Sequence, residues 1–243
     1  IVPIWGPDKK VTGIIDVLNK RAYEMQKLKR VEIQLPEDKE AVVDEFHDAL
    51  KEAVAETDEA LMDRFFEGDD FTYREMITGL HQGVTELSLF PVLCGSSVNC
   101  LGSLMLMDHI IELLPNPVEG NYHKATTADG KVEEFVVSPG GVPAAFVWKT
   151  VSDQFGKYSF VKVLSGEITS DTTLVNSRTG ETEKLGRLYT MCGKKNTEVK
   201  VLSCGDIGAI GKMDKVKTGD TLCDPRKVVS LKQIPYPAPC YSM

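Results

Sequence analysis

The spacing of apolar residues changes its period near residue 118, and this change constrains the fold more than any other feature of the chain. From Glu37 to Phe66, apolar residues recur every three or four positions. That spacing predicts amphipathic helices with one face on a core. From Ala144 onward, short β-branched segments alternate with glycine turns, as they do in all-β domains. We therefore expect two modules of different fold class.

The front module is expected to combine strands and helices. Residues 10–17 and 31–35 have the β-branched or alternating composition of strands. Thr57-Asp58 marks a break between two helices, and Gly68 ends the second of them. The apolar run at residues 89–94 is typical of a short buried strand.

Two more helices complete the expected front module. Thr72 and Glu75 have the spacing of a capping box, which predicts a helix that runs to about His81. The last helix runs from about Ser103 to Leu114, where the following prolines stop it.

The back module is expected to be a closed β-barrel. Its predicted strands are residues 145–151, 158–164, 172–176, 182–191, 207–210 and 221–223. Serine, threonine and glycine turns separate them. Six short strands without a long helix favour a barrel. Residues 118–143 are glycine-rich with little apolar pattern, so we interpret them as a linker with a polar loop or hairpin.

The composition and charge are those of globular modules. The 243 residues are 42% hydrophobic and 26% charged, with a net charge of −8. No stretch approaches the ~18 apolar residues of a membrane span. Residues 1–120 hold 11 basic and 23 acidic side chains, whereas residues 121–243 hold 17 and 13. This asymmetry suggests different partners for the two modules; solvated faces of uneven composition are the alternative explanation.

The residues alone indicate no catalytic or metal site. The nearest approach to a phosphate loop, residues 205–213, has a spacing one residue too long, and Met213 cannot ligate a metal. The six cysteines form no C-x-x-C pair, which favours reduced thiols in a cytoplasmic protein. The four histidines are expected on helix surfaces or in loops.

Three ordered stretches resemble one known family. The first is residues 52–68. The second joins residues 91–97 to Gly102 and the Leu-Leu-Pro-Asn-Pro run at 113–117. The third comprises residues 145–150, 156–157, 163–166, 205–207 and 219–224. In this order and spacing they strongly resemble bacterial translation elongation factor G, a translational GTPase, over nearly the whole chain.

The resemblance implies an internal piece of a multidomain α+β protein. Residues 1–90 would be an insert subdomain of the GTPase domain and residues 91–117 its last strand and helix. Residues 118–143 would be a linker or loop, 144–228 the β-barrel second domain with six or more strands, and 229–243 the start of the third domain. The phosphate loop would precede Ile1, so this piece is expected to be non-catalytic and without a bound cofactor.

The resemblance also implies a function for the full-length protein. It would bind GTP with Mg²⁺, hydrolyse it on the ribosome and promote translocation in the cytoplasm. The backbone of Gly95, Ser96 and Ser97 would be the remnant of the guanine site. The barrel would contact small-subunit ribosomal RNA, for which the candidate side chains are Lys157, Arg187, Lys194 and Lys195, the last two in the loop 193–196. The acidic insert would contact a ribosomal stalk protein, and neither DNA nor a membrane is expected as a partner.

Two alternatives stay open at this point. One is a ribosomal protection factor or divergent paralogue with the same domains and another task. The other is a stand-alone RNA- or protein-binding module without a GTPase core.

Overall fold

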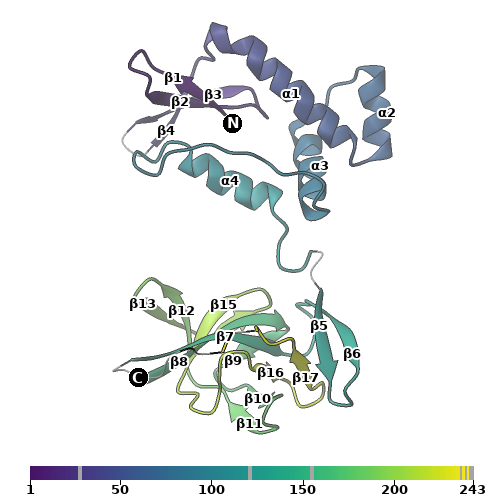
Figure 1. Ribbon diagram of the computed structural model, residues 1–243, viewed down its shortest axis with the longest axis vertical. Coiled ribbons are helices and arrows are strands. Elements are labelled where there is room, and N and C mark those ends of the chain that lie inside the picture. Colours follow the sequence, from purple (N-terminus) through teal and green to yellow (C-terminus); the bar gives the residue numbers. More distant parts are fainter. Residues whose placement is uncertain (27–28, 120–121, 154–155, 236, 239, 241–243) are drawn as a thin grey trace. The chain divides into compact units, whose positions relative to one another are not determined.

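The computed structural model describes residues 1–26, 29–119, 122–153, 156–235, 237–238 and 240. The chain divides into two compact units, residues 1–115 and 116–243 (Figure 1). The change of unit falls where the apolar period changes, as the sequence predicts. The division of the chain into five parts stays a prediction.

Unit 1 contains a four-stranded antiparallel sheet in the order β1-β2-β3-β4. Its strands are β1 (Val2–Trp5), β2 (Val11–Asp16), β3 (Arg21–Gln26) and β4 (Lys29–Ile33). Ile14 packs with Leu101 and Met105 on the α4 side, whereas Ile15 packs with Val43 of α1. Because successive side chains point to opposite faces, both faces of β2 are covered. This explains its run of apolar residues.

The helices of unit 1 follow the sequence prediction closely. After a short 3₁₀ turn at Glu37–Lys39 come α1 (Glu40–Ala55), α2 (Glu59–Glu67), α3 (Tyr73–Thr85) and α4 (Ser103–Leu113). The Asp58 side chain caps α2 by accepting hydrogen bonds from the N–H groups of Ala60 and Leu61. Gly68 ends the helix with a φ of 85°. The capping box before α3 is present. Leu18, Val54, Met76, Leu80 and Leu113 form the core among α1, α3 and α4.

The prediction of a strand at residues 89–94 is wrong. This segment is extended but unpaired in the described part of the chain, and Phe90 and Val92 are exposed. An apolar run becomes a strand only where a neighbouring strand pairs with it in a ladder of hydrogen bonds. Here the contacts with the start of the sheet are isolated: the Ile1 amino group lies 3.5 Å from the Val92 carbonyl and the Cys94 thiol 3.6 Å from the Ile1 carbonyl. The bridge from Ser96 to Leu101 comes only after this segment.

Unit 2 is built on an eight-stranded antiparallel sheet in the order β11-β10-β16-β7-β8-β15-β12-β13. Its strands are β7 (Ala144–Asp153), β8 (Gly156–Ser165), β10 (Thr173–Asn176), β11 (Thr182–Lys184), β12 (Leu188–Cys192), β13 (Lys195–Val199), β15 (Ile207–Gly211) and β16 (Thr221–Cys223). A two-stranded sheet joins β9 (Glu167–Thr169) to β14 (Val201–Ser203).

The eight-stranded sheet curls on itself. Strands β11 and β12 are six intervals apart in the order, which would be roughly 29 Å in a flat sheet. Only three residues, 185–187, connect them, and four Cα steps reach at most about 14 Å. At one end of this connection the Leu185 N–H donates to the Thr172 carbonyl beside β10 at 3.0 Å, and at the other the Arg187 carbonyl accepts from the Gly211 N–H of β15 at 3.0 Å. The sheet therefore has the barrel shape expected, although the described strand pairings include no ladder between its end strands.

The predicted strand 182–191 is two strands, β11 and β12. The break lies where the chain passes from one end of the sheet to the other, and Leu185 there is buried in the barrel core. Residues 118–143 contain a hairpin, as one of the two interpretations expected. Its strands, β5 (Tyr122–Thr127) and β6 (Val132–Val136), form a sheet with β17 (Val229–Leu231) in the order β17-β5-β6.

The buried carboxylate of Asp220 organises one end of the barrel. It accepts hydrogen bonds from Asn176 Nδ2 at 2.7 Å, Arg178 Nε at 2.6 Å and the Lys217 N–H at 2.9 Å. Burial raises the pKa of Asp220, but these bonds outweigh it and hold the pKa below the usual value. The residue thus ties the β10–β11 turn to the loop before β16.

We predict that Asp220→Ala destabilises unit 2 by about 2 kcal/mol, because the buried Asn176 amide loses its acceptor. Denaturant unfolding of the 243-residue chain, followed by circular dichroism, measures the change. Asp214→Ala, at an exposed position in the same loop, is the control and leaves the midpoint unchanged. Equal midpoints for both variants would contradict the role assigned to Asp220.

We also predict an acid-sensitive contribution from Glu75. Hydrogen bonds from Thr72, then the contact with Arg64, lower the pKa of Glu75 to about 2 from 4.5. A lowered folded-state pKa stabilises the fold above pH 4.5, and this contribution is lost as pH falls toward 2. Glu75→Gln should flatten the pH dependence of unit 1 stability over that same range. Glu67→Gln, at the exposed end of α2, should keep the wild-type slope.

Candidate functional site

The turn at residues 95–97 is a tight fold-back onto the start of α4. The Ser96 N–H donates to the Leu101 carbonyl at 2.8 Å. A Cβ on Gly95 would lie 2.8 Å from that carbonyl oxygen, and one on Gly102 would lie 2.8 Å from the Cys94 carbonyl oxygen. Both positions therefore require glycine. The Ser96 N–H is already hydrogen-bonded within the turn. The assignment of residues 95–97 to a guanine contact stays a prediction.

The Lys157 side chain forms hydrogen bonds within unit 2. Its Nζ donates to the carbonyls of Asp214 and Val216 at 2.8 and 2.7 Å. The ammonium therefore closes the loop that leads from β15 to β16. A lysine that already donates to two carbonyls has only one of its three N–H groups left for a phosphate.

The other three basic candidates gather near one hairpin. Arg187 precedes β12 and lies 3.5 Å from Glu198 of β13. Gly193 and Lys194 form the two-residue turn between these strands, and both Lys194 and Lys195 are exposed. Lys195 is the first residue of β13, not a loop residue as predicted, because it pairs with Cys192 across the turn. Lys157 lies on another strand, β8.

A polar group that the sequence did not reveal lies on α4. His109 is buried rather than at the surface or in a loop, which corrects the expectation for this histidine. Its Nε2 lies 3.9 Å from Asp16 Oδ2 and its Nδ1 lies 3.4 Å from Glu112 Oε2. The Tyr73 hydroxyl donates to Glu112 at 3.0 Å, and burial together with this bond raises the pKa of Tyr73 to about 12.

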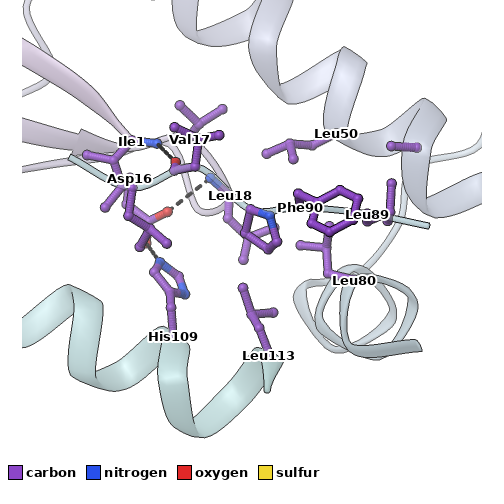
Figure 2. A pocket seen from close by; sticks show the side chains of 14 residues that line it. Ile1, Asp16, Val17, Leu18, Leu50, Leu80, Leu89, Phe90, His109 and Leu113 are labelled. Carbon is purple, nitrogen blue, oxygen red and sulfur yellow. Dashed lines mark hydrogen bonds and ion pairs between the residues drawn. The ribbon is translucent and has the colours of Figure 1, made fainter. Parts of the chain in front are cut away.

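An apolar pocket of about 260 Å³ opens beside His109 (Figure 2). Leu18, Leu50, Leu80 and Leu113 line it, and Phe90 stands at its rim. His109 points toward Asp16 at its polar end. The walls suit a small apolar group, and Asp16 and His109 form the polar end. Within the described ranges, no cluster of three or more His, Cys, Asp or Glu could hold a metal, and no helix is long and apolar enough to span a membrane.

Three comparisons show which known proteins the chain is similar to. Residues 143–225 match the family described as elongation factor G domain 2. Over 98% of its length the chain is 32% identical to Elongation factor G 2 of Saccharophagus degradans, of which it covers 35%. A crystal structure of a Thermus thermophilus protein matches with a TM-score of 0.76 and 26% identity, over 92% of this chain and 31% of that one. The chain spans about a third of the length of these relatives.

The curled antiparallel sheet of unit 2 and the mixed fold of unit 1 agree with the Thermus thermophilus structure. The family match and the curated relative make the chain a translation-factor-like segment. The matched segment begins just before β7 and ends just after β16, so it coincides with the barrel. Residues 143–225 match domain 2 of the elongation factor G family, and the chain as a whole resembles a segment of elongation factor G.

We predict that Lys157 stabilises unit 2 rather than binding a partner. Lys157→Met should lower the thermal midpoint of unit 2 because two backbone carbonyls lose their donor. Lys194→Gln, on the exposed turn, is the control and should leave the midpoint unchanged. Calorimetry of the 243-residue chain compares them, and an unchanged midpoint for Lys157→Met would contradict the prediction.

Proposed function

We propose that this chain is part of a ribosome-associated GTPase that promotes translocation during polypeptide elongation. The observation that carries the proposal is the match of the barrel to elongation factor G domain 2. The similarity of unit 1 to the same kind of protein supports it, because one aligned relative covers both units. The proposal places the protein in the cytoplasm, where translation takes place.

GTP hydrolysis is assigned to parts of the full-length protein outside these 243 residues. The chain has no G-x-x-x-x-G-K-[ST] motif to hold phosphates and Mg²⁺. Gly95, Ser96 and Ser97 would contribute only backbone groups to a guanine site formed with those other parts. The 243-residue chain by itself is therefore proposed to be non-catalytic and to bind no nucleotide tightly.

The two units are proposed to contact different ribosomal components. Unit 2 would dock on small-subunit RNA, and Arg187, Lys194 and Lys195 supply exposed positive charge on one hairpin. The acidic residues that dominate positions 1–120 repel RNA and suit a protein partner such as a basic surface of the ribosomal stalk.

We predict that the full-length protein sediments with ribosomes and that the bound fraction falls as salt rises, because counterion release drives phosphate contacts. Lys194→Gln with Lys195→Gln should reduce the bound fraction at low salt, whereas Lys10→Gln with Lys131→Gln removes as much charge elsewhere and should not. Binding that is independent of salt would contradict RNA docking.

The same preparation tests which part of the protein hydrolyses GTP. The full-length protein should hydrolyse GTP faster when ribosomes are added, and the 243-residue chain should release no phosphate from GTP under identical conditions. Turnover by the 243-residue chain would overturn the assignment of catalysis to other parts of the protein.

A further inference from the structure

A second basic surface of unit 2 lies away from the β12–β13 hairpin. A groove forms where the β17-β5-β6 sheet packs on the outer face of β7 and β8. Its basic side chains are Lys124 on β5, Lys162 on β8 and Lys232 after β17. Phe146, Leu164 and Leu231 give it an apolar floor. We call this surface the lysine groove.

The alternation of β7 and β8 explains why Lys162 faces the groove. Val161 and Val163 point into the barrel core, whereas Leu164 belongs to the cluster beneath the β17-β5-β6 sheet. Lys162 shares that outer face and lies directly across from Phe146. The strand pattern therefore places an ammonium group beside an aromatic ring on a partly covered surface.

Lys162 is half-buried, and no carboxylate forms an ion pair with it in the described part of the chain. Its positive charge, after the larger effect of burial, lowers the pKa of His123 in the same groove. Two carboxylates lie near by, one on β6 and one in the turn before β15. Glu134 is the cross-strand neighbour of Lys124, and Asp206 accepts the Ser203 N–H. Neither forms an ion pair with a groove lysine among the described residues.

A partly desolvated cation without a counter-charge, such as Lys162, costs free energy that an incoming anion recovers. Lys124 and Lys232 add exposed charge from two other segments, so the anion that the groove fits is extended rather than a single small ion. The apolar floor adds a surface on which a ribose or base can pack. These features together favour a phosphodiester chain over an acidic peptide, whose carboxylates stand on side chains and need no flat apolar floor.

We propose that the lysine groove binds the sugar–phosphate backbone of RNA, with Lys124, Lys162 and Lys232 as phosphate contacts and Phe146 beneath a ribose or base. The inference rests on the proposed docking of unit 2 on ribosomal RNA and assigns that docking a surface separate from the Lys194–Lys195 turn.

The test measures binding of the 243-residue chain to a fluorescent single-stranded RNA of about 20 nucleotides, longer than the ~4–16 nucleotides that one small barrel occupies. Fluorescence anisotropy at several salt concentrations gives the affinity and its salt dependence. Lys162→Gln with Lys232→Gln should weaken binding about tenfold near 0.1 M salt and reduce the slope of log K against log salt by roughly 0.7 per lysine removed. Circular dichroism checks that each variant is folded.

Lys184→Gln with Lys200→Gln is the matched control, since both residues are exposed in unit 2 and do not line the groove. The control should bind RNA like the wild type. An equal loss in both double variants would overturn the proposal, because it would reflect total charge alone. Displacement of the RNA by polyglutamate at an equal concentration of charge would also overturn it, in favour of an acidic protein partner.

Ribosome sedimentation of the full-length protein separates this inference from the proposed function. If the wild type sediments with ribosomes and the Lys162→Gln, Lys232→Gln variant does so equally well, the lysine groove inference fails and the proposed function stands. If the wild type itself does not sediment, the proposed function fails, whatever the 243-residue chain does with the RNA oligonucleotide.

Discussion

The three-residue connection between β11 and β12 is the constraint on which unit 2 depends. Because it joins strands six intervals apart in the sheet order, the sheet has to curl until its ends approach each other. Curling brings one face of every strand toward a common axis, where a single buried cluster fills the interior. The opposite face is then convex, and only part of it is covered by the β17-β5-β6 sheet. Where that cover ends, the lysine groove opens.

Unit 1 is packed differently from unit 2. Its small sheet is covered by α1 on one face and by α4 on the other, so β2 is buried on both sides. The helices are held by local caps at Asp58 and Thr72 and by the core that Leu18 and Leu113 share with α1 and α3. The outer side of α4 carries exposed apolar side chains, Met107 and Ile111 among them.

The features that the sequence predicted well are local ones. The break at Asp58, the end at Gly68 and the capping box at Thr72 depend on side chains within a few residues, so their spacing is sufficient. The strand predicted at residues 89–94 failed because a strand depends on a partner that no local pattern supplies. The break at Leu185 does have a local signal, Gly186, because a glycine inside a strand pattern indicates a break or a bulge.

Candidate site residues were harder to predict because the role of a charged side chain depends on what the fold places beside it. Lys157 and Lys162 are the same residue type on one strand, β8. Yet Lys157 Nζ is bonded to two carbonyls, whereas Lys162 faces a groove with two other lysines. Arg178 is likewise held by the buried Asp220. The positive charge of residues 121–243 therefore divides into cations that the fold uses and cations that it leaves available, and only the second group is suited to an external anion.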